Sequence, residues 1–329
     1  MLIHLLQMVG GMTILVLGGD LMVRGASSLA RSLGISPLAV GLTVVAFGTS
    51  APELAVSLGA AFNGSGNLAF GNIFGSNLAN IGLIIGLSAL IRPLPIDGLV
   101  TRRELPMMIL AVAAASVMAS DVLLGESVAQ YSRSDGLIFL LFFVVFIFYT
   151  VGDLIRQRSA KNRSIANGDA VSEQVSDAAT SKHVSRDLTQ IVIGLVGLLL
   201  GAHFTVDGAV AVALILGVPE VVVGLTVVSV GTSLPELVAT LSAVRRGELA
   251  IAVGGVVGSN IFNILLVCGL TSVVMPIVIP MGGLLDLAIT AVLSLALLLV
   301  ARTHSRLILR WEGAGLLLSY LTYMVWRSL

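Results

Sequence analysis

The sequence predicts an all-α polytopic membrane protein whose ten transmembrane helices form two inverted five-helix repeats. Three observations support this fold class. Hydrophobic residues make up 57% of the 329-residue chain and charged residues only 11%, whereas an average soluble protein has about 25% charged residues. One long segment occurs twice. Basic residues gather in alternate connections between the apolar runs, as they do in proteins that cross a bilayer repeatedly.

The duplicated segment covers Gly41–Asn80 and returns as Gly224–Asn263. The copies align at a constant offset without a gap, and half of the aligned positions are identical. A repeat of this length is typical of a duplicated structural unit. Glu53 and Glu236 are the only acidic residues that both copies share. Because a carboxylate inside an apolar segment is costly in a membrane, we expect these two glutamates to have a function.

The polar stretch from about Arg156 to Asp187 divides the chain, and its content of Ser, Ala, Asn and charge predicts a mobile linker. The first apolar run lacks a basic n-region and a cleavage site, so we expect a retained helix rather than a signal peptide. The expected units are a first five-helix repeat over 1–153, a polar linker over 154–187 and a second repeat over 188–329. The ten runs of transmembrane length lie at roughly 3–30, 38–61, 68–90, 104–120, 135–153, 188–216, 221–244, 249–272, 283–301 and 308–326.

The distribution of Lys and Arg predicts the topology. Alternate connections hold 15 of the 18 basic residues, while the opposite face holds only Arg133 and Arg327. The positive-inside rule therefore predicts a cytoplasmic linker and both termini outside. Because five is odd, the second repeat enters the membrane from the side opposite to the first. Inverted repeats of this kind are typical of secondary transporters, whose substrate site lies at mid-membrane where the repeats meet.

Each copy of the repeat carries a polar motif next to a proline. Proline has no N–H, so the helix is expected to bend or break there, and such freed backbone is tolerated in a bilayer only beside protein or a polar cavity. A threonine and a glutamate four residues apart share one face of the helix. The motif consists of Thr49, Ser50, Pro52 and Glu53 in the first copy and of Thr232, Ser233, Pro235 and Glu236 in the second.

A second motif follows on the next apolar run. Gly75 and Gly258 are expected to allow close helix approach there. Carboxylates, hydroxyls, amides and free carbonyls gathered at one point are hard oxygen donors, which suit Ca²⁺ or Na⁺ rather than soft metals. The single Cys268 and four scattered histidines predict no soft-metal site. The donors that this second motif adds are Ser76, Asn80, Ser259 and Asn263.

Structural explanations compete with this functional one. Glycine and serine in membrane helices most often serve close packing, and a proline is often only a kink. Thr-Ser-x-Pro-Glu occurs in both copies, and each glutamate is followed, at the same distance along the chain, by the serine of Gly-Ser-Asn-x-x-Asn. This recurrence of two glutamates in register favours a site over packing alone.

The first and sixth runs also carry charged residues in corresponding places. Asp20 and Arg24 are four residues apart on the first run, and His203 and Asp207 are their counterparts on the sixth. Either each pair interacts locally within its helix, or Arg24 pairs with Asp207 across the pseudo-symmetry axis and couples the two helices during transport.

The sequences GTSAPE and GTSLPE, with GSNLAN and GSNIFN, resemble the repeats of the sodium/calcium exchanger branch of the cation/Ca²⁺ exchanger superfamily. The resemblance covers the whole chain and implies a core of eight helices past which two long helices slide. It also implies a prokaryotic cell (inner) membrane. Many relatives carry an acid where this chain has Asn263, which argues against a potassium site. The implied ligands are Glu53 and Glu236, hydroxyls of Thr49, Ser50, Thr232 and Ser233, flanking Ser76 and Ser259, and carbonyls of Ala46 and Ser229.

The expected function is a Na⁺/Ca²⁺ antiporter without a cofactor, active as a monomer in the bilayer and without a nucleic-acid partner. A proton-coupled exchanger of Ca²⁺ or another divalent cation is the alternative. Cation channels usually place a pore on an axis between symmetric subunits, which an inverted repeat within one chain disfavours. An intramembrane enzyme is disfavoured because the chain has neither H-E-x-x-H nor G-x-S-x-G.

Overall fold

The computed structural model describes residues 1–120, 129–166, 177–217, 229–304 and 306–328, and these are almost entirely helical. The prediction of an all-α chain is confirmed, apart from four very short strands. The first half contains α1 (Leu2–Leu33), α2 (Pro37–Val40), η1 (Gly41–Val45), α3 (Ala46–Thr49), α4 (Ala51–Phe62), α5 (Gly66–Ala79), η2 (Asn80–Ile85), α6 (Gly86–Ile91), β1 (Leu94–Pro95), η3 (Val100–Glu104), α7 (Leu105–Met118), β2 (Gln130–Tyr131) and α8 (Arg133–Ala166). Segments η are π-helical turns within longer helices.

The second half repeats this order. It contains α9 (Asp177–Ile215), α11 (Ser229–Thr232), α12 (Leu234–Arg246), α13 (Leu249–Phe262), η6 (Asn263–Cys268), α14 (Gly269–Val274), β3 (Ile277–Val278), α15 (Gly283–Val300), β4 (Leu307–Ile308) and α16 (Arg310–Ser328). Asn80 and Asn263, which occupy matching repeat positions, both begin a π-helical turn.

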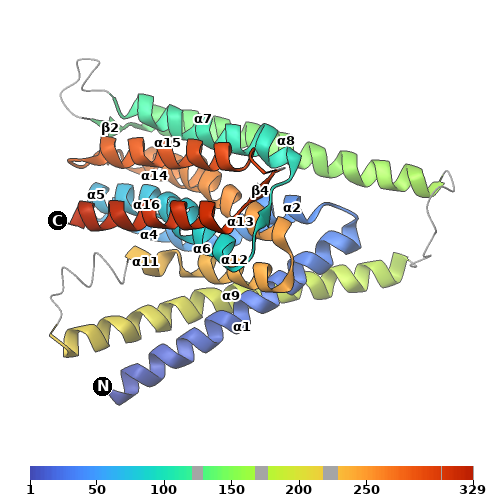
Figure 1. Cartoon of the computed structure of the whole chain (residues 1–329), viewed down its shortest axis with the longest axis horizontal. Helices are drawn as coiled ribbons and strands as arrows, with labels where there is room; N and C mark the ends of the chain where they lie inside the picture. Colours follow the sequence, from blue (N-terminus) through green and yellow to red (C-terminus); the bar gives the residue numbers. More distant parts are fainter. Residues whose placement is uncertain (121–128, 167–176, 218–228, 305, 329) are drawn as a thin grey trace.

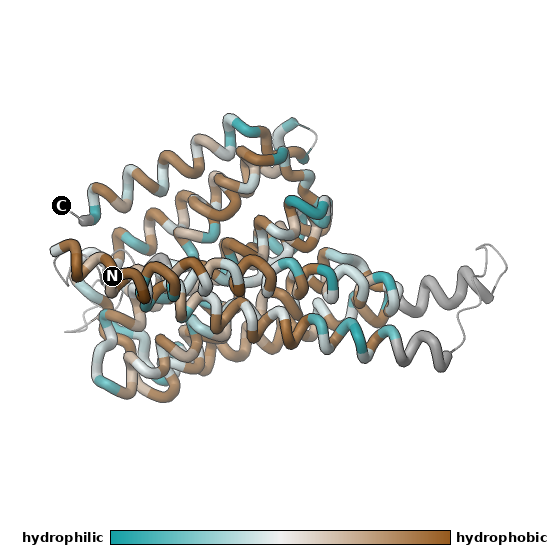
Figure 2. The backbone as a smooth tube through the Cα atoms, turned by 90° about the horizontal axis from the view of Figure 1, so that it is seen from below, coloured by the Kyte–Doolittle hydropathy of each residue, from teal (hydrophilic) through white to brown (hydrophobic). Residues whose placement is uncertain are grey.

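Seven helical stretches of the described chain are long and apolar enough to cross a membrane. The other three predicted runs are also helical, but their helices are shorter or more polar than these seven. The fourth run corresponds to η3–α7, the seventh to α11–α12 and the tenth to α16. The start of the seventh run, up to residue 228, lies outside the described residues. Figure 2 shows hydrophobic stretches between more hydrophilic helix ends. The seven are Leu2–Leu33, Pro37–Phe62, Gly66–Ile91, Arg133–Arg156, His183–Ile215, Leu249–Val274 and Gly283–Val300.

Helices extend into the predicted linker from both ends, so most of this stretch is helical. α8 continues to Ala166, past the other helices in Figure 1, and α9 already begins at Asp177. Ala, Arg, Gln and Lys favour helix, which explains the extension. Near the end of the stretch Asp187 is buried, and its Oδ2 accepts a hydrogen bond from Ser32 Oγ at 3.0 Å. Residues 167–176 lie outside the described chain.

The last helix of each half packs against the other half. Strand β1 pairs with β4, and β2 pairs with β3, so each short sheet joins one half to the other. A Cβ added at Gly86 would lie 2.9 Å from the carbonyl of Gly313 on α16. A Cβ at Gly136 of α8 would lie 2.7 Å from the carbonyl of Gly269 on α14. Each fifth helix therefore packs against the third helix of the opposite half.

The long helices α1 and α9 lie against each other along one edge of the molecule (Figure 1). Regularly spaced glycines allow this contact, because a Cβ at each of them would lie within 3.0 Å of the partner's backbone. Helices can approach this closely only where side chains are small. The glycines are Gly11, Gly18 and Gly25 on α1 and Gly194, Gly201 and Gly208 on α9, at the same offset as the two copies of the repeat.

The repeated segment breaks as its prolines predict. Ser50 separates α3 from α4 with φ −81° and ψ 1°, and Ser233 has φ −87° and ψ 3° at the start of α12. Opposite the first break, a Cβ at Gly258 would lie 2.8 Å from the carbonyl of Leu42, so the predicted close approach is confirmed there. None of the described residues lies within 4 Å of a Cβ at Gly75. By the repeat, its partner segment is 218–228, which is not described.

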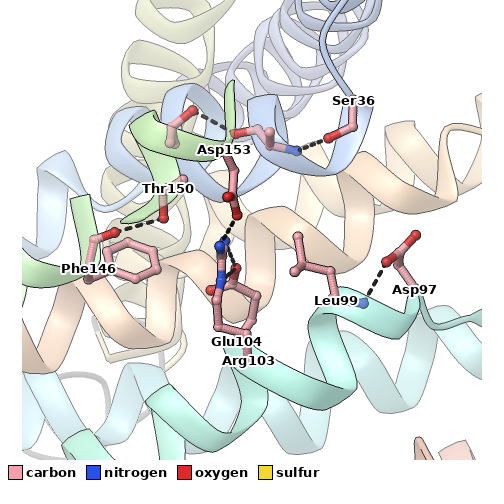
Figure 3. A network of polar contacts seen from close by, with 10 residues as sticks. Ser36, Asp97, Leu99, Arg103, Glu104, Phe146, Thr150 and Asp153 are labelled. Carbon is pink, nitrogen blue, oxygen red and sulfur yellow. Dashed lines mark hydrogen bonds and ion pairs between the residues drawn. The ribbon is translucent and has the colours of Figure 1, made fainter. Parts of the chain in front are cut away.

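A polar network ties α8 to the start of the fourth run (Figure 3). Arg103 Nε donates to Glu104 Oε1 at 2.8 Å, and Arg103 Nη1 also pairs with Asp153 on α8. Glu104 is completely buried, so the guanidinium supplies the countercharge that a buried carboxylate requires. The network fixes the first half's swapped helix at one end.

We expect Gly18→Ala to lower the thermal stability of the purified protein by several degrees. Its Cβ would lie 2.6 Å from the backbone nitrogen of Leu198, and such overpacking costs about 1–3 kcal/mol. Gly10→Ala is the matched control on the same helix, because none of the described residues lies within 4 Å of a Cβ there. Thermal unfolding in detergent measures both. Equal stability of the two variants would contradict the role assigned to the glycine stripe.

Candidate functional site

The two repeated glutamates sit in matching positions on their helices. Glu53 lies in the first turn of α4 and Glu236 in the first turn of α12, each just after the break at Ser50 or Ser233. The N-terminus of a helix carries partial positive charge and free N–H groups, which favour a nearby anion. Both glutamates are buried, with 0% and 3% of their surface exposed.

Side chains of both repeats meet around these carboxylates. Ser76 Oγ donates to Glu53 Oε1 at 3.4 Å, and Ser233 Oγ of the opposite repeat lies 3.3 Å from Ser76 Oγ. The side chains of Glu53 and Glu236 are close enough to interact, and Thr49 lies beside Glu236. Six predicted residues are therefore brought together: Glu53, Glu236, Thr49, Ser76, Ser233 and Ser259, the last with its Oγ 3.3 Å from Thr49 Oγ1.

Several buried oxygens of this cluster lack a hydrogen-bond donor within the described chain. They are Glu53 Oε2, both carboxylate oxygens of Glu236 and Ser50 Oγ. A buried charge without a partner costs several kcal/mol, so such groups are normally paired or bound to a cation. The ion pairs found among the described residues include neither glutamate. The cluster therefore concentrates negative charge that a cation could neutralise.

The asparagines predicted for the site lie one helical turn beyond the serines. Asn80 Nδ2 donates to Asn260 Oδ1 at 3.0 Å, and Asn263 Nδ2 donates to Asn77 Oδ1 at 3.2 Å. The oxygens of Asn80 and Asn263 accept no hydrogen bond from the described residues. Sequence reasoning missed Asn77 and Asn260, although both copies of Gly-Ser-Asn contain them as polar residues in an apolar run.

Asn72 is a further residue that the sequence analysis missed. Its Nδ2 donates to the main-chain oxygen of Glu53 at 3.0 Å and to Ser57 Oγ at 2.9 Å. The repeat gives no signal for it, because the equivalent position in the second copy is Gly255.

The remaining predicted residues flank the cluster. Ala46 is buried, and its carbonyl accepts the N–H of Ser50 at 3.0 Å and lies 3.5 Å from Thr49 Oγ1. Thr232 ends α11 and is half-buried. Ser229 begins α11, but its side chain lies outside the described part of the structure.

The charged residues of the two long helices pair locally within each helix, which is the first of the two alternatives that the sequence left open. Arg24 pairs with Asp20 at 2.8 Å, and His203 Nε2 lies 3.3 Å from Asp207. Asp20 also pairs with Arg246 at the end of α12. The pairing of Arg24 with Asp207 across the axis is not observed in this structure.

The donor set decides which ions the cluster suits. Among the described residues, no group of three or more His, Cys, Asp or Glu could hold a metal ion. The cluster offers two carboxylates together with hydroxyl and amide oxygens, which are ligands for hard cations such as Na⁺ and Ca²⁺.

Comparisons with known proteins agree with this chemistry. The family model described as "Sodium/calcium exchanger protein" matches residues 3–152 and 187–329. The chain belongs to the sodium/calcium exchanger family. It is 32% identical to the sodium/calcium exchanger MaX1 of Methanosarcina acetivorans and 35% identical to the putative antiporter CaxA of Alkalimonas amylolytica, in each case over 98% of both chains.

A solved structure of the sodium-calcium exchanger NCX_Mj is similar over 98% of both chains, with a TM-score of 0.83 and 31% identity. The Inner membrane protein YrbG of Escherichia coli is 37% identical over 84% of this chain and 81% of its own. This exchanger is therefore a prokaryotic-type membrane protein of a family of cation/Ca²⁺ antiporters, which are transporters rather than enzymes.

We expect Glu236→Gln to raise the thermal stability of the exchanger in metal-free buffer at mildly alkaline pH. The amide has the same shape but never carries a charge, so it avoids the cost of burying this carboxylate without a cation or of protonating it, and should stabilise the fold by about 1–3 kcal/mol. The same substitution at Glu312, whose two oxygens accept hydrogen bonds from Thr303 and Leu309, should instead lower stability. Thermal unfolding with chelator present measures both, and a destabilised Glu236→Gln would count against this cost.

Proposed function

We propose that this exchanger expels Ca²⁺ in exchange for Na⁺ by alternating access at the buried cluster. The observation that carries the proposal is the pair of neighbouring glutamates, one from each repeat, with three carboxylate oxygens that lack a donor among the described residues. Two carboxylates neutralise one Ca²⁺, and the same oxygens can hold several Na⁺ ions instead. A site that takes either cation but is costly when empty favours exchange over one-way leakage.

The ligand set we propose is the one that the sequence resemblance implies. Glu53 and Glu236 would be the principal ligands, and the other donors would complete the shells of Ca²⁺ and of the sodium ions. Support comes from the hydrogen bonds that gather Thr49, Ser259, Ser76 and Ser233 around the carboxylates. The other proposed donors are the side chains of Ser50, Thr232, Asn80 and Asn263 and the carbonyls of Ala46 and Ser229.

We further propose ten spans in two inverted repeats over residues 1–153 and 188–329, with 154–187 between them on the cytoplasmic side and both termini outside. The exchanged strand pairs and glycine crossings support this, because each contact has a counterpart in the opposite half. The α1–α9 pair would slide along the core as one unit and expose the cluster to each side in turn. We propose the monomer as the transporting unit, in a prokaryotic cell membrane.

Proton-coupled exchange through the same carboxylates is the second candidate. The observation that favours it is their burial, since a protonated carboxyl is the cheaper state in an apolar site that lacks a cation. The hydroxyl-rich shell of Thr49, Ser76, Ser233 and Ser259 favours sodium, because hydroxyl oxygens add nothing to proton binding at a carboxylate but supply ligands to a metal ion.

Calcium uptake into proteoliposomes distinguishes these candidates. With the pH clamped equal on both sides, we expect an outward Na⁺ gradient to drive isotopic Ca²⁺ into the vesicles. A pH gradient alone should drive no Ca²⁺ uptake. Glu53→Gln and Glu236→Gln should each reduce uptake to the level of empty vesicles while the protein still elutes as a folded species. Wild-type-like uptake by either variant would overturn the ligand assignment, and uptake driven only by protons would favour the second candidate.

Asn263→Asp tests whether the asparagine side chains beyond the serines contribute to ion binding. The change adds a negative charge one helical turn beyond Ser259, so we expect a stronger dependence of transport on pH and an altered preference among Na⁺, K⁺ and Ca²⁺. Uptake under each imposed cation gradient, measured over a range of pH, reports both effects. If neither the preference nor the pH dependence changed, Asn263 would not lie near the transported ions.

A further inference from the structure

Four buried asparagines form two directed chains of hydrogen bonds across the interface between the repeats. In the first chain, Asn77 Nδ2 donates to the main-chain oxygen of Asn260 at 3.4 Å, and Asn77 Oδ1 accepts from Asn263 at 3.2 Å. In the second, Asn260 Nδ2 contacts Met108 Sδ at 3.4 Å, and Asn260 Oδ1 accepts from Asn80 at 3.0 Å. Each of these four asparagines is at most 1% exposed.

Both chains run in the same direction. A side-chain amide has a donating end and an accepting end, so the partner of one end decides where the other points. The NH₂ group of Asn77 donates to the main-chain oxygen of Asn260, and that of Asn260 contacts Met108 Sδ. Their side-chain oxygens accept from the NH₂ groups of Asn263 and Asn80, respectively. Each chain therefore begins at an asparagine whose own carbonyl oxygen, Asn80 Oδ1 or Asn263 Oδ1, accepts nothing from the described residues.

Asn80 and Asn263 lie on the same helix faces as Ser76 and Ser259, which belong to the buried cluster around Glu53 and Glu236. Asn80 is four residues after Ser76, which donates to Glu53, and residues four apart share one face of a helix. Asn263 is four residues after Ser259, which contacts Thr49. The hydrogen bonds to Asn77 and Asn260 come from the opposite repeat in both cases.

We propose that Asn77 and Asn260 are positioning residues that hold the amides of Asn263 and Asn80 with oxygen, rather than NH₂, presented to the transported cation. This inference rests on the proposed function, because it assigns a use to the two free oxygens. An asparagine amide keeps nearly the same shape when it turns over, but it then presents donors that repel a cation. Turning either amide over would leave a buried NH₂ and a buried acceptor without partners, which the chain of hydrogen bonds prevents.

The two chains of hydrogen bonds differ in their last acceptor. The first ends on a main-chain carbonyl, which is a strong acceptor fixed by the helix, whereas the second ends on the thioether of Met108, which is a weak acceptor. Because each repeat orients a ligand of the other, the ligand geometry depends on how the two halves dock.

A double-mutant cycle tests the inference. Asn260→Leu removes the acceptor for Asn80, and we expect the Ca²⁺ concentration at half-maximal uptake to rise about tenfold, with the maximal rate changed by less than about twofold. Asn80→Asp has two equivalent oxygens and no amide to turn over. In an Asn80→Asp background, Asn260→Leu should therefore change that concentration by less than about threefold, as expected for a coupled pair.

The same cycle with Asn77→Leu and Asn263→Asp tests the other chain, and Asn→Ala at 77 or 260 replaces Leu if the larger side chain prevents folding. An equal shift in both backgrounds would show that Asn260 only fills space, and no shift in the wild-type background would also overturn the inference. Failure of the proposed function would appear separately, as wild-type protein without sodium-driven Ca²⁺ uptake. In that case stabilisation by Ca²⁺ in thermal unfolding, measured over the same four variants, still decides whether Asn260 orients a ligand.

Discussion

The burial of two neighbouring carboxylates is the constraint on which the rest of the structure depends. Neither Glu53 nor Glu236 has a basic partner among the described ion pairs, and three of their four oxygens accept no hydrogen bond there. The surrounding chain offsets this cost in small steps. Breaks at Ser50 and Ser233 begin a helix just before each glutamate, so partial positive charge faces the carboxylate, and serine hydroxyls approach from the next helix. What these neutral groups leave uncompensated is about the charge of one divalent cation.

The exchange of helices between halves explains how this arrangement is held in place. Glycine crossings at Gly86–Gly313 and Gly136–Gly269 and the strand pairs β1–β4 and β2–β3 tie each half to the other on both sides of the cluster. Neither half can complete the cluster alone, since Ser76 contacts both Glu53 of its own repeat and Ser233 of the other. The α1–α9 pair is tied to this core by polar contacts near one end, where Ser27 and Arg31 bind Glu248.

The sequence predicted those parts of the site that depend on local chemistry. The proline motifs predicted the helix breaks, and the spacing of Thr49 and Glu53 and of Ser76 and Asn80 predicted which side chains share a face. It could not predict which partners Asn80 and Asn263 would choose, because that depends on how the repeats dock. The π-helical turns that begin at Asn80 and Asn263 were not predicted either, because the apolar periodicity of a run does not distinguish them from α-helix. The helical ends of the linker were missed because polar composition suggested disorder, although the same residues favour helix.

Duplication and divergence make separate contributions to the cluster. Duplication supplies the donors in pairs and would by itself give a site with nearly equal halves. Divergence removes that equality, because Asn72 holds the main-chain oxygen of Glu53 whereas its counterpart is Gly255. Glu53 also accepts from Ser76, while neither oxygen of Glu236 accepts a hydrogen bond from the described residues. The described residues therefore hold the two glutamates differently, although duplication placed them at matching positions on their helices.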